Sequence, residues 1–387
     1  MNDANAKKDC DLLLTKRLYL AHMMCLGERR DPISIHERSI SYSFAGDDLQ
    51  SEKLFESEEI AQHLGDQLFI PDSSIRFRRY DALPQLENLS RGRSVVMLNE
   101  AHHVSRHRIF ALQLARVLRK QGFTHLAVEG LSTSVKTNAL GYVSLDSPAT
   151  GAYTQDPEFA YFLREAINLG YELVSYEVFN TKSIEERELG QAKNIAKIIE
   201  NNPYAKVLVY AGYGHIRKSA SKSHIDWMAK IFGQLTGINP LSIDQVGGTP
   251  AYYSALTPST WKEVENDLIS TSSVFKENGN WLVSGTYKGT VDITVFHPKQ
   301  KLTNGRPDWL SENRQKHVVK ASSLGTVRPA IVRAILKGDK NGVPIDQVYL
   351  RNVEDVTLLI PSGEYDIELE NLENGNRIIY TINLKPL

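Results

Sequence analysis

The sequence predicts an α/β protein in which a mainly parallel sheet, flanked by helices, precedes a C-terminal antiparallel β-sandwich. Two observations support this fold class. Between residues 91 and 250, short apolar runs alternate with helical segments, a pattern typical of βαβ units and a parallel sheet. Beyond residue 280, short runs rich in Val, Ile, Thr and Tyr are separated by turn residues, which indicates antiparallel strands.

The parallel sheet is predicted from five short apolar runs. Runs of this length and composition are typical of strands that are buried on both faces. They cover Ser94–Leu98, His125–Glu129, Tyr171–Tyr176, Lys206–Ala211 and Pro240–Val246.

Segments with helical spacing of apolar residues separate these strands. Two helix starts can be recognised in the sequence. At the first, Asp156 is a favourable N-cap and Pro157 a favourable first helical residue. At the second, Ser183 and Glu186 have the spacing of a capping box. We expect helices over residues 105–121, 157–170, 184–202 and 223–235.

The chain divides into four regions by these patterns. Strands and helices alternate in only one of them, and the N-terminal part lacks a clear pattern. We expect an N-terminal helical or irregular extension (1–90) with helices at 11–26 and 57–68, the α/β domain (91–250), a connecting region (251–315) and the small β-sandwich (316–387).

The composition is that of an ordinary globular protein, with 41% hydrophobic and 24% charged residues and a net charge of −1. This balance argues against a nucleic-acid partner, which requires a basic excess. No segment approaches the roughly 20 apolar residues of a membrane span. The sequence as given predicts a cytoplasmic location, or a periplasmic or secreted one if a leader has been removed. The two cysteines, Cys10 and Cys25, allow either one disulfide or two buried thiols.

Acidic and histidine side chains follow four of the predicted strands. Parallel sheets bind ligands outside the carboxyl ends of their strands, so these side chains should converge at one edge. In chain order they are Glu100, His102 and His103 after the first strand, Glu129 at the end of the second, Glu177 after the third and His215 after the fourth.

Such a cluster has a definite chemistry. Neighbouring carboxylates repel each other, and a metal, a histidinium or an arginine such as Arg106, Arg108 or Arg187 would relieve the repulsion. Glu with His is the residue set for acid–base work on water and for binding Zn, Mn or Fe. A single Glu at a strand end is most often a solvated loop residue, but the joint placement after four strands favours a functional site.

Four sequence blocks resemble, in this order, those of the erythromycin esterase-like and ChaN-like superfamily, a group that also includes TraB and Tiki-type proteins. The blocks are VVMLNEAHH, LAVEG, EERELGQAKNIAKII and VLVYAGYGHI, within residues 93–246. The resemblance assigns site roles to Glu100, to His102 or His103 according to the subgroup, and to Glu129, Arg187 and His215. Asn99 departs from the glycine usual at its position.

The resemblance implies a site but leaves the substrate open. Esterase-like members open macrolactones with water activated by a Glu/His pair, Tiki-type members resemble metal-dependent peptidases, and ChaN-like members resemble haem- or iron-binding proteins. We therefore expect a hydrolase that cleaves an ester, a lactone or an amide of a small-molecule or peptide substrate. A homodimer remains compatible with the sequence.

Specific roles follow for the residues of this site. His103 or His102 would be the general base, Glu100 and Glu129 would orient the water, and His215 with Arg187 or Arg106 would stabilise the oxyanion. If a divalent metal (Zn, Mn or Fe) assists, its expected ligands are Glu100, His102, Glu129, His215 and Glu177.

Three alternatives use the same chain differently. The first is a haem-, iron- or other metal-binding protein without turnover, in which Tyr142, Tyr153, Phe159 and Tyr213 line a haem slot. The second is a biosynthetic enzyme that modifies a peptide or natural product. The third makes the C-terminal sandwich the working part, docking to a partner or glycan.

Overall fold

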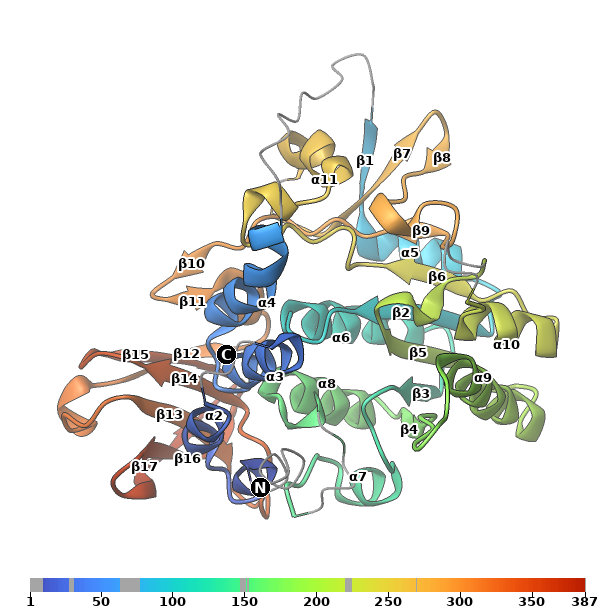
Figure 1. The fold of residues 1–387 in the computed structure, drawn as a ribbon. Coiled ribbons are helices and arrows are strands. Elements are labelled where there is room, and N and C mark those ends of the chain that lie inside the picture. The colour runs from blue at the N-terminus through green and yellow to red at the C-terminus, as the bar shows by residue number, and fades with distance from the viewer. Residues whose placement is uncertain are drawn as a thin grey trace.

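The fold consists of a helix-flanked central sheet, with the N-terminal helices and the C-terminal sheets packed beside it (Figure 1). The computed structural model describes residues 10–27, 31–62, 77–146, 151, 153–219, 225–268 and 270–386.

The central sheet has six parallel strands in the order β4-β3-β5-β2-β6-β9. All five predicted strands are present, and their bounds agree within two residues, so the prediction of a mainly parallel, helix-flanked sheet is confirmed. The strands are β2 (Val95–Glu100), β3 (His125–Val128), β4 (Glu172–Ser175), β5 (Val207–Gly212), β6 (Leu241–Asp244) and β9 (Ile293–Thr294).

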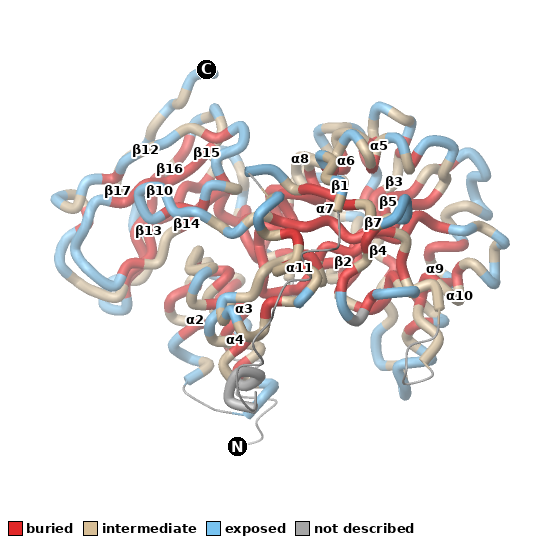
Figure 2. The backbone as a smooth tube through the Cα atoms, turned by 90° about the horizontal axis from the view of Figure 1, so that it is seen from above, coloured by how far each residue is buried: buried red, intermediate tan, exposed pale blue. Residues whose placement is uncertain are grey.

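Two helical layers cover the sheet, because successive residues of a strand point to opposite faces. In β2, Val96 and Leu98 pack in the core with α6 (Arg106–Arg119) and α8 (Pro157–Asn168). Val95 and Met97 pack in the other core with α9 (Ile184–Asn201) and α10 (Met228–Thr236). Helix α5 (Ala82–Ser90) joins the first layer, and the strands between the layers are buried (Figure 2). The short α7 (Val135–Leu140) lies in the long loop after β3.

The N-terminal region is more helical than the sequence suggests. The expected helix over 11–26 is interrupted by a turn at residues 15–17 before α2 (Tyr19–Cys25). Helix α3 (Pro32–Phe44), which was not predicted, has Asp31 as its N-cap and buries Ile35, Ile40 and Phe44. Helix α4 (Asp48–Gln62) begins nine residues before the expected start at 57, and residues 63–68 lie outside the described residues.

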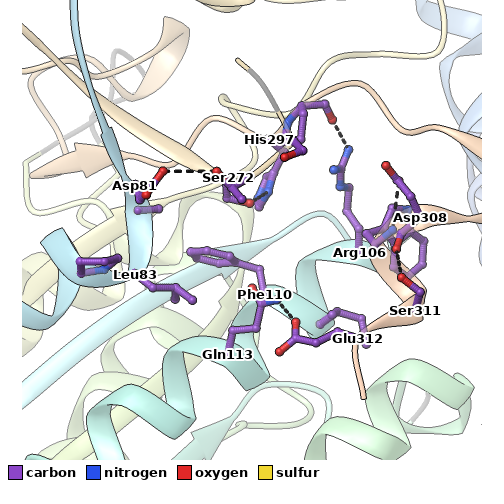
Figure 3. Close-up of a pocket in the computed structure, with 17 residues that line it drawn as sticks. Asp81, Leu83, Arg106, Phe110, Gln113, Ser272, His297, Asp308, Ser311 and Glu312 are labelled. Atoms are coloured by element: carbon purple, nitrogen blue, oxygen red, sulfur yellow. Dashed lines mark hydrogen bonds between the residues drawn. The ribbon is translucent and has the colours of Figure 1, made fainter. Parts of the chain in front are cut away.

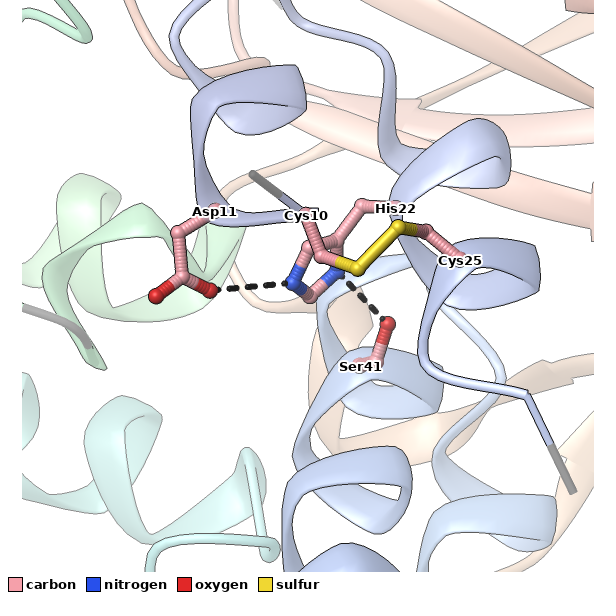
Figure 4. The surroundings of a disulfide bond; sticks show 5 residues. All are labelled: Cys10, Asp11, His22, Cys25 and Ser41. Carbon is pink, nitrogen blue, oxygen red and sulfur yellow. Dashed lines mark hydrogen bonds and ion pairs between the residues drawn. A yellow bond between two sulfur atoms is a disulfide. The ribbon is translucent and has the colours of Figure 1, made fainter. Parts of the chain in front are cut away.

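A disulfide joins Cys10 to Cys25, with their Cα atoms 5.6 Å apart, so the first of the two cysteine alternatives holds (Figure 4). Beside it, the His22 ring lies 3.0 Å from the Ser41 hydroxyl and 3.5 Å from Asp11. The disulfide ties Cys10 to the last residue of α2, and the His22–Ser41 contact links α2 to α3.

The connecting region contributes strands to two sheets. Strand β7 (Ser273–Glu277) pairs with β1 (Phe77–Asp81) and with β8 (Asn280–Trp281) in an antiparallel sheet. Strand β9 extends the central sheet, so this sheet takes in residues beyond 250. The same region holds α11 (Ser259–Val264) and the hairpin of β10 (Leu302–Thr303) and β11 (Arg306–Pro307).

The C-terminal strands are antiparallel, as predicted. They form a four-stranded sheet in the order β14-β13-β16-β17 and a separate β12-β15 pair. Their bounds are β12 (Gln315–Val319), β13 (Ala330–Leu336), β14 (Asp346–Leu350), β15 (Val356–Ile360), β16 (Gly363–Asn371) and β17 (Gly375–Leu384). Arg314 in this part forms an ion pair with Glu158 of α8. Within the described ranges, no helix has the length and apolarity needed to cross a bilayer.

Candidate active site

The carboxyl ends of the strands bring together five of the predicted site residues. Glu100 ends β2 opposite Gly212 of β5, and Glu129 directly follows β3. His102, Glu129 and His215 are each less than 10% exposed. The convergence inferred from the strand ends is therefore present for Glu100, His102, Glu129, Glu177 and His215.

Glu100 and His102 form the first part of the site. The His102 Nδ1 atom lies 2.9 Å from Glu100 Oε1. The other carboxylate oxygen accepts hydrogen bonds from Arg108 Nε at 3.0 Å and from the Tyr210 hydroxyl at 2.7 Å. Burial alone would raise the pKa of Glu100, but the Arg108 guanidinium and the bonds from His102 and Tyr210 hold it below its ordinary value. Glu100 is therefore ionised at neutral pH.

An ionised Glu100 determines the tautomer of His102. A carboxylate can only accept, so the Nδ1 of His102 donates its proton to Glu100 and the Nε2 carries the free lone pair. The ring is held by Tyr153, stacked at 4.0 Å between centroids, and by Tyr213, edge-on at 5.2 Å. Its Nε2 faces Gly212, where a Cβ atom would lie only 2.7 Å away. His102 is thus an oriented base.

Arg187 organises the second part of the site. Its guanidinium binds Glu177 through two hydrogen bonds, of 3.0 Å and 2.6 Å, and donates a third to Glu129 at 2.7 Å. The other oxygen of Glu129 accepts the backbone N–H of Gly212. Gln191 adds a donor to Glu177 at 2.9 Å. Because the side chain of Arg187 is 31% exposed, it links this buried network to solvent.

His215 is held between two carboxylates. Its Nδ1 lies 2.7 Å from Glu188, and its Nε2 lies 3.4 Å from Glu129. Burial would lower the pKa of His215, but Glu129 and Glu188 raise it to about 10, so the ring is an imidazolium at neutral pH. Its Nε2 also lies 3.1 Å from Arg187 Nη1, and the two cations share the Glu129 oxygen between them. These charges hold the pKa of Glu129 well below its ordinary value, against the effect of burial.

The five metal ligands predicted from the sequence converge, but they are not arranged to hold a metal ion. Among the described residues, no group of three or more His, Cys, Asp and Glu side chains is arranged to hold a metal ion. The geometry gives the reason, because the Arg187 guanidinium lies between Glu129 and Glu177, and Arg108 is bound to Glu100. Arginine and histidinium, two of the three cation types expected to relieve the carboxylate repulsion, fill that role here.

Two predicted site residues lie elsewhere. His103 points away from the carboxylates and stacks on Phe55 at 3.6 Å, and burial, with His36 and His102 nearby, lowers its pKa well below its ordinary value. Arg106 donates to the backbone carbonyl of Pro298 at 2.9 Å. Helical residues two positions apart point in nearly opposite directions, so Arg106 turns away from the site into which Arg108 points.

The expected haem slot is also not formed by its four residues. Tyr153 and Tyr213 contact His102, but Tyr142 lies beside Arg164, and Phe159 is buried in the core with Phe162. Tyr153 and Tyr213 therefore line the site and Phe159 belongs to the core, and these four aromatic residues do not form an open apolar slot.

Tyr210 and Glu188 are site residues that the sequence reasoning missed. Tyr210 lies inside β5, two residues before Gly212, and its hydroxyl reaches Glu100. Glu188 lies inside α9, and its second oxygen accepts the backbone N–H of Met228 at 2.8 Å. In the sequence, Tyr210 cannot be distinguished from an ordinary core residue of an apolar strand. Likewise, Glu188 cannot be distinguished from an ordinary surface residue of a helix.

Comparisons with known proteins give only distant similarities. No family model and no curated protein matches the chain. The type III effector HopBA1 is 15% identical, covering 44% of this chain and 87% of its own, with a TM-score of 0.29. RRSP, a MARTX toxin effector domain from Vibrio vulnificus, is 16% identical over 55% of this chain and 44% of its own, with a TM-score of 0.31. The C-terminal region of Pasteurella multocida toxin, described with a thiol-protease-like catalytic triad, is 11% identical over 91% of this chain and 53% of its own, with a TM-score of 0.32. Scores at this level do not show a common fold, so the functional proposal has to rest on the geometry of the site.

Proposed function

We propose that the protein is a hydrolase of the erythromycin esterase-like and ChaN-like superfamily, in which His102 activates water to cleave an ester, a lactone or an amide. The observation that carries the proposal is the Glu100–His102 pair, 2.9 Å apart, with the histidine Nε2 turned toward Gly212. A buried carboxylate that fixes one ring nitrogen leaves the other as a general base.

The proposed reaction begins with transfer of a water proton to the Nε2 of His102 while the water oxygen attacks the substrate carbonyl carbon. The positive charge that develops on His102 is stabilised by Glu100, whose own charge is secured by Arg108 and Tyr210. Collapse of the tetrahedral intermediate breaks the bond to the leaving alcohol or amine. The leaving group takes the proton from His102, which restores the base.

The second part of the site supplies charge to the reaction. Arg187 and the His215 imidazolium are donors on the far side of Glu129, and Arg187 is partly exposed. We assign them to the negative charge that develops on the carbonyl oxygen. Because both are bound to carboxylates, their positions are fixed before substrate arrives, which avoids the cost of reorganising them during the reaction.

The disulfide bears on where this activity takes place. Structural disulfides persist in oxidising compartments and are rare in the cytosol. The Cys10–Cys25 bond thus favours the periplasmic or secreted alternative over the cytoplasmic one.

The test is a hydrolysis panel of esters, lactones and peptides with the wild type and His102→Gln. We expect His102→Gln to lower kcat by about 10²- to 10⁴-fold on any substrate that is cleaved. The matched control is His125→Gln, since His125 begins β3 at the opposite end of the sheet. Chelator-dialysed enzyme is expected to retain its activity, because arginines and not metal-ligand groups surround the carboxylates. Full activity of His102→Gln, or no cleavage of any member of the panel, would contradict the proposal.

A further inference from the structure

A cavity lies on the other side of α6 from the catalytic pair. It has a volume of about 540 Å³ and is enclosed by α5, α6, the approach to β7, the segment after β9 and the stretch that follows β11 (Figure 3). This volume is in the range of small-molecule sites. None of the residues Glu100, His102, Glu129, Glu177 and His215 lines it.

Arg106 is the unusual group in this cavity. It is only 7% exposed, yet within the described part of the chain it donates a hydrogen bond to a neutral acceptor, the Pro298 carbonyl at 2.9 Å. Among the described residues, no carboxylate lies within ion-pair distance of its guanidinium. Burial lowers the pKa of Arg106 to about 10, so it stays charged at neutral pH. A buried cation without a counter-ion is costly unless a ligand supplies one.

Two neighbouring acids, Glu52 and Asp308, attract the charge of Arg106, but neither forms an ion pair with it. Burial and the nearby Asp48 raise the pKa of Glu52 to about 8, so Glu52 is largely uncharged at neutral pH. Asp308 accepts backbone N–H groups of Lys301 and Trp309. The remaining carboxylates of the rim are also bound to donors of the protein, Asp81 to Arg79 and Glu312 to Gln113 and Arg116.

The wall that Ser272 and His297 form beside Arg106 is polar, and its side chains are uncharged. The Ser272 hydroxyl lies 2.8 Å from Nδ1 of His297, whose Nε2 lies 3.1 Å from the Gln245 amide oxygen. Burial lowers the pKa of His297 well below its ordinary value, so the ring is neutral. His297 Nε2 then donates to Gln245, and the Ser272 hydroxyl donates to Nδ1. This wall brings no second cation into the cavity.

The floor between these two walls is apolar. Phe110 and Ile109 of α6, with Leu83 and Pro84 of α5, line it, and Phe110 lies between Arg106 and Leu83 in the view of Figure 3. A ligand that reaches Arg106 must therefore lay an apolar body over this floor.

We propose that this cavity binds a small carboxylate with an apolar body, its carboxylate on the Arg106 guanidinium and its body over Phe110 and Leu83. A carboxylate matches the planar guanidinium and supplies the charge that the protein leaves out. The site is separate from the catalytic pair and does not depend on the proposed hydrolysis. Helix α6 connects the two, since Arg106 faces the cavity and Arg108 holds Glu100.

The test is isothermal titration calorimetry of the full chain with three probes of one shape, phenylbutyrate, phenylbutanamide and phenylbutylamine. We expect saturable binding of phenylbutyrate that weakens with added salt, and little or no binding of the amide and the amine. Arg106→Gln should weaken phenylbutyrate binding by about tenfold or more. The matched control is Arg119→Gln on the same helix, because Arg119 also donates to backbone carbonyls but lies outside the cavity.

A second variant guards against misfolding of the first. Leu83→Glu places a negative charge over the floor and should abolish phenylbutyrate binding while circular dichroism shows a folded chain. The proposal is overturned if phenylbutylamine binds as tightly as phenylbutyrate, since the rim acids would then be the recognition groups. It is equally overturned if Arg106→Gln and Leu83→Glu both leave the affinity unchanged, or if the wild type binds no probe.

Discussion

Replacing His215 tests the charge balance of the site most directly. In the wild type, the imidazolium lies 2.7 Å from Glu188 and 3.4 Å from Glu129. The substitution His215→Gln keeps a polar side chain but removes the positive charge. Glu129 still has Arg187, whereas Glu188, whose side chain is fully buried, keeps as its donor among the described residues the backbone N–H of Met228. The variant therefore leaves a buried carboxylate without its cation.

The magnitude follows from the pKa of His215. Folding raises this pKa from 6.5 to about 10. Each pH unit between these values corresponds to about 1.4 kcal/mol, so the full contribution of the charge to stability is roughly 5 kcal/mol. Breaking a buried ion pair by removing one partner costs a similar roughly 3–5 kcal/mol. Because the pKa is raised in the folded state, this stability is fully present below pH 6.5 and is lost as pH rises toward 10.

The assay is urea unfolding followed by circular dichroism, for both proteins, between pH 6.5 and about 10. We expect His215→Gln to be less stable by roughly 5 kcal/mol near pH 6.5, and the two stabilities to converge toward pH 10. Comparing the two proteins cancels the titration of the groups that they share. His125→Gln serves as the control, since His125 faces the largely exposed Glu172 and such pairs contribute little. A stability difference that is independent of pH, or that grows as pH rises, would refute the reasoning.

Three further predictions follow, two at positions around the base and one at the disulfide. Gly212→Ala places a Cβ 2.6 Å from the His102 ring and should lower kcat by about 10²-fold without unfolding the chain, whereas Gly233→Ala, with its nearest contact at 3.5 Å, should leave hydrolysis rates unchanged. Tyr210→Phe removes a buried donor at 2.7 Å from the catalytic carboxylate and should shift the acidic limb of the pH–rate profile upward, with an approximately tenfold loss of kcat; an unshifted limb would exclude this role. Cys25→Ser opens a 15-residue loop and should cost about 3 kcal/mol in urea unfolding without reductant, and a stability equal to that of the wild type would contradict it.

The central sheet could be predicted because β2, β5 and β6 are buried on both faces and β3 is almost fully buried. Each of the five strands is a short apolar run, and this pattern survives without knowledge of the partners. Strand β9 could not be assigned in the same way. Only Ile293 and Thr294 pair with β6, and the choice between a parallel and an antiparallel neighbour depends on chain that is distant in sequence. Helix α3 was missed because its apolar residues are interleaved with Ser, Arg and Glu.

The site could be predicted only at the level of strand ends. Parallel pairing brings those ends to one edge, so Glu100, Glu129 and His215 had to converge once the strands were correct. The loop after β2 decides which of the adjacent residues His102 and His103 enters the site. Its course depends on the packing of His102 against Tyr153 and of His103 against Phe55. The choice between Arg106 and Arg108 depends on the rotation of α6, which a sequence pattern does not fix.

The excess of negative charge around His102 favours the transfer of a proton to this ring. Five buried or half-buried carboxylates are linked to only three cations, namely Glu100, Glu129, Asp156, Glu177 and Glu188 to Arg108, Arg187 and His215. A positive charge that appears on His102 during proton transfer is therefore stabilised by the carboxylates around it. A metal ion among the same carboxylates would cancel that field. The fixed arginines leave part of this field in place around the His102 ring.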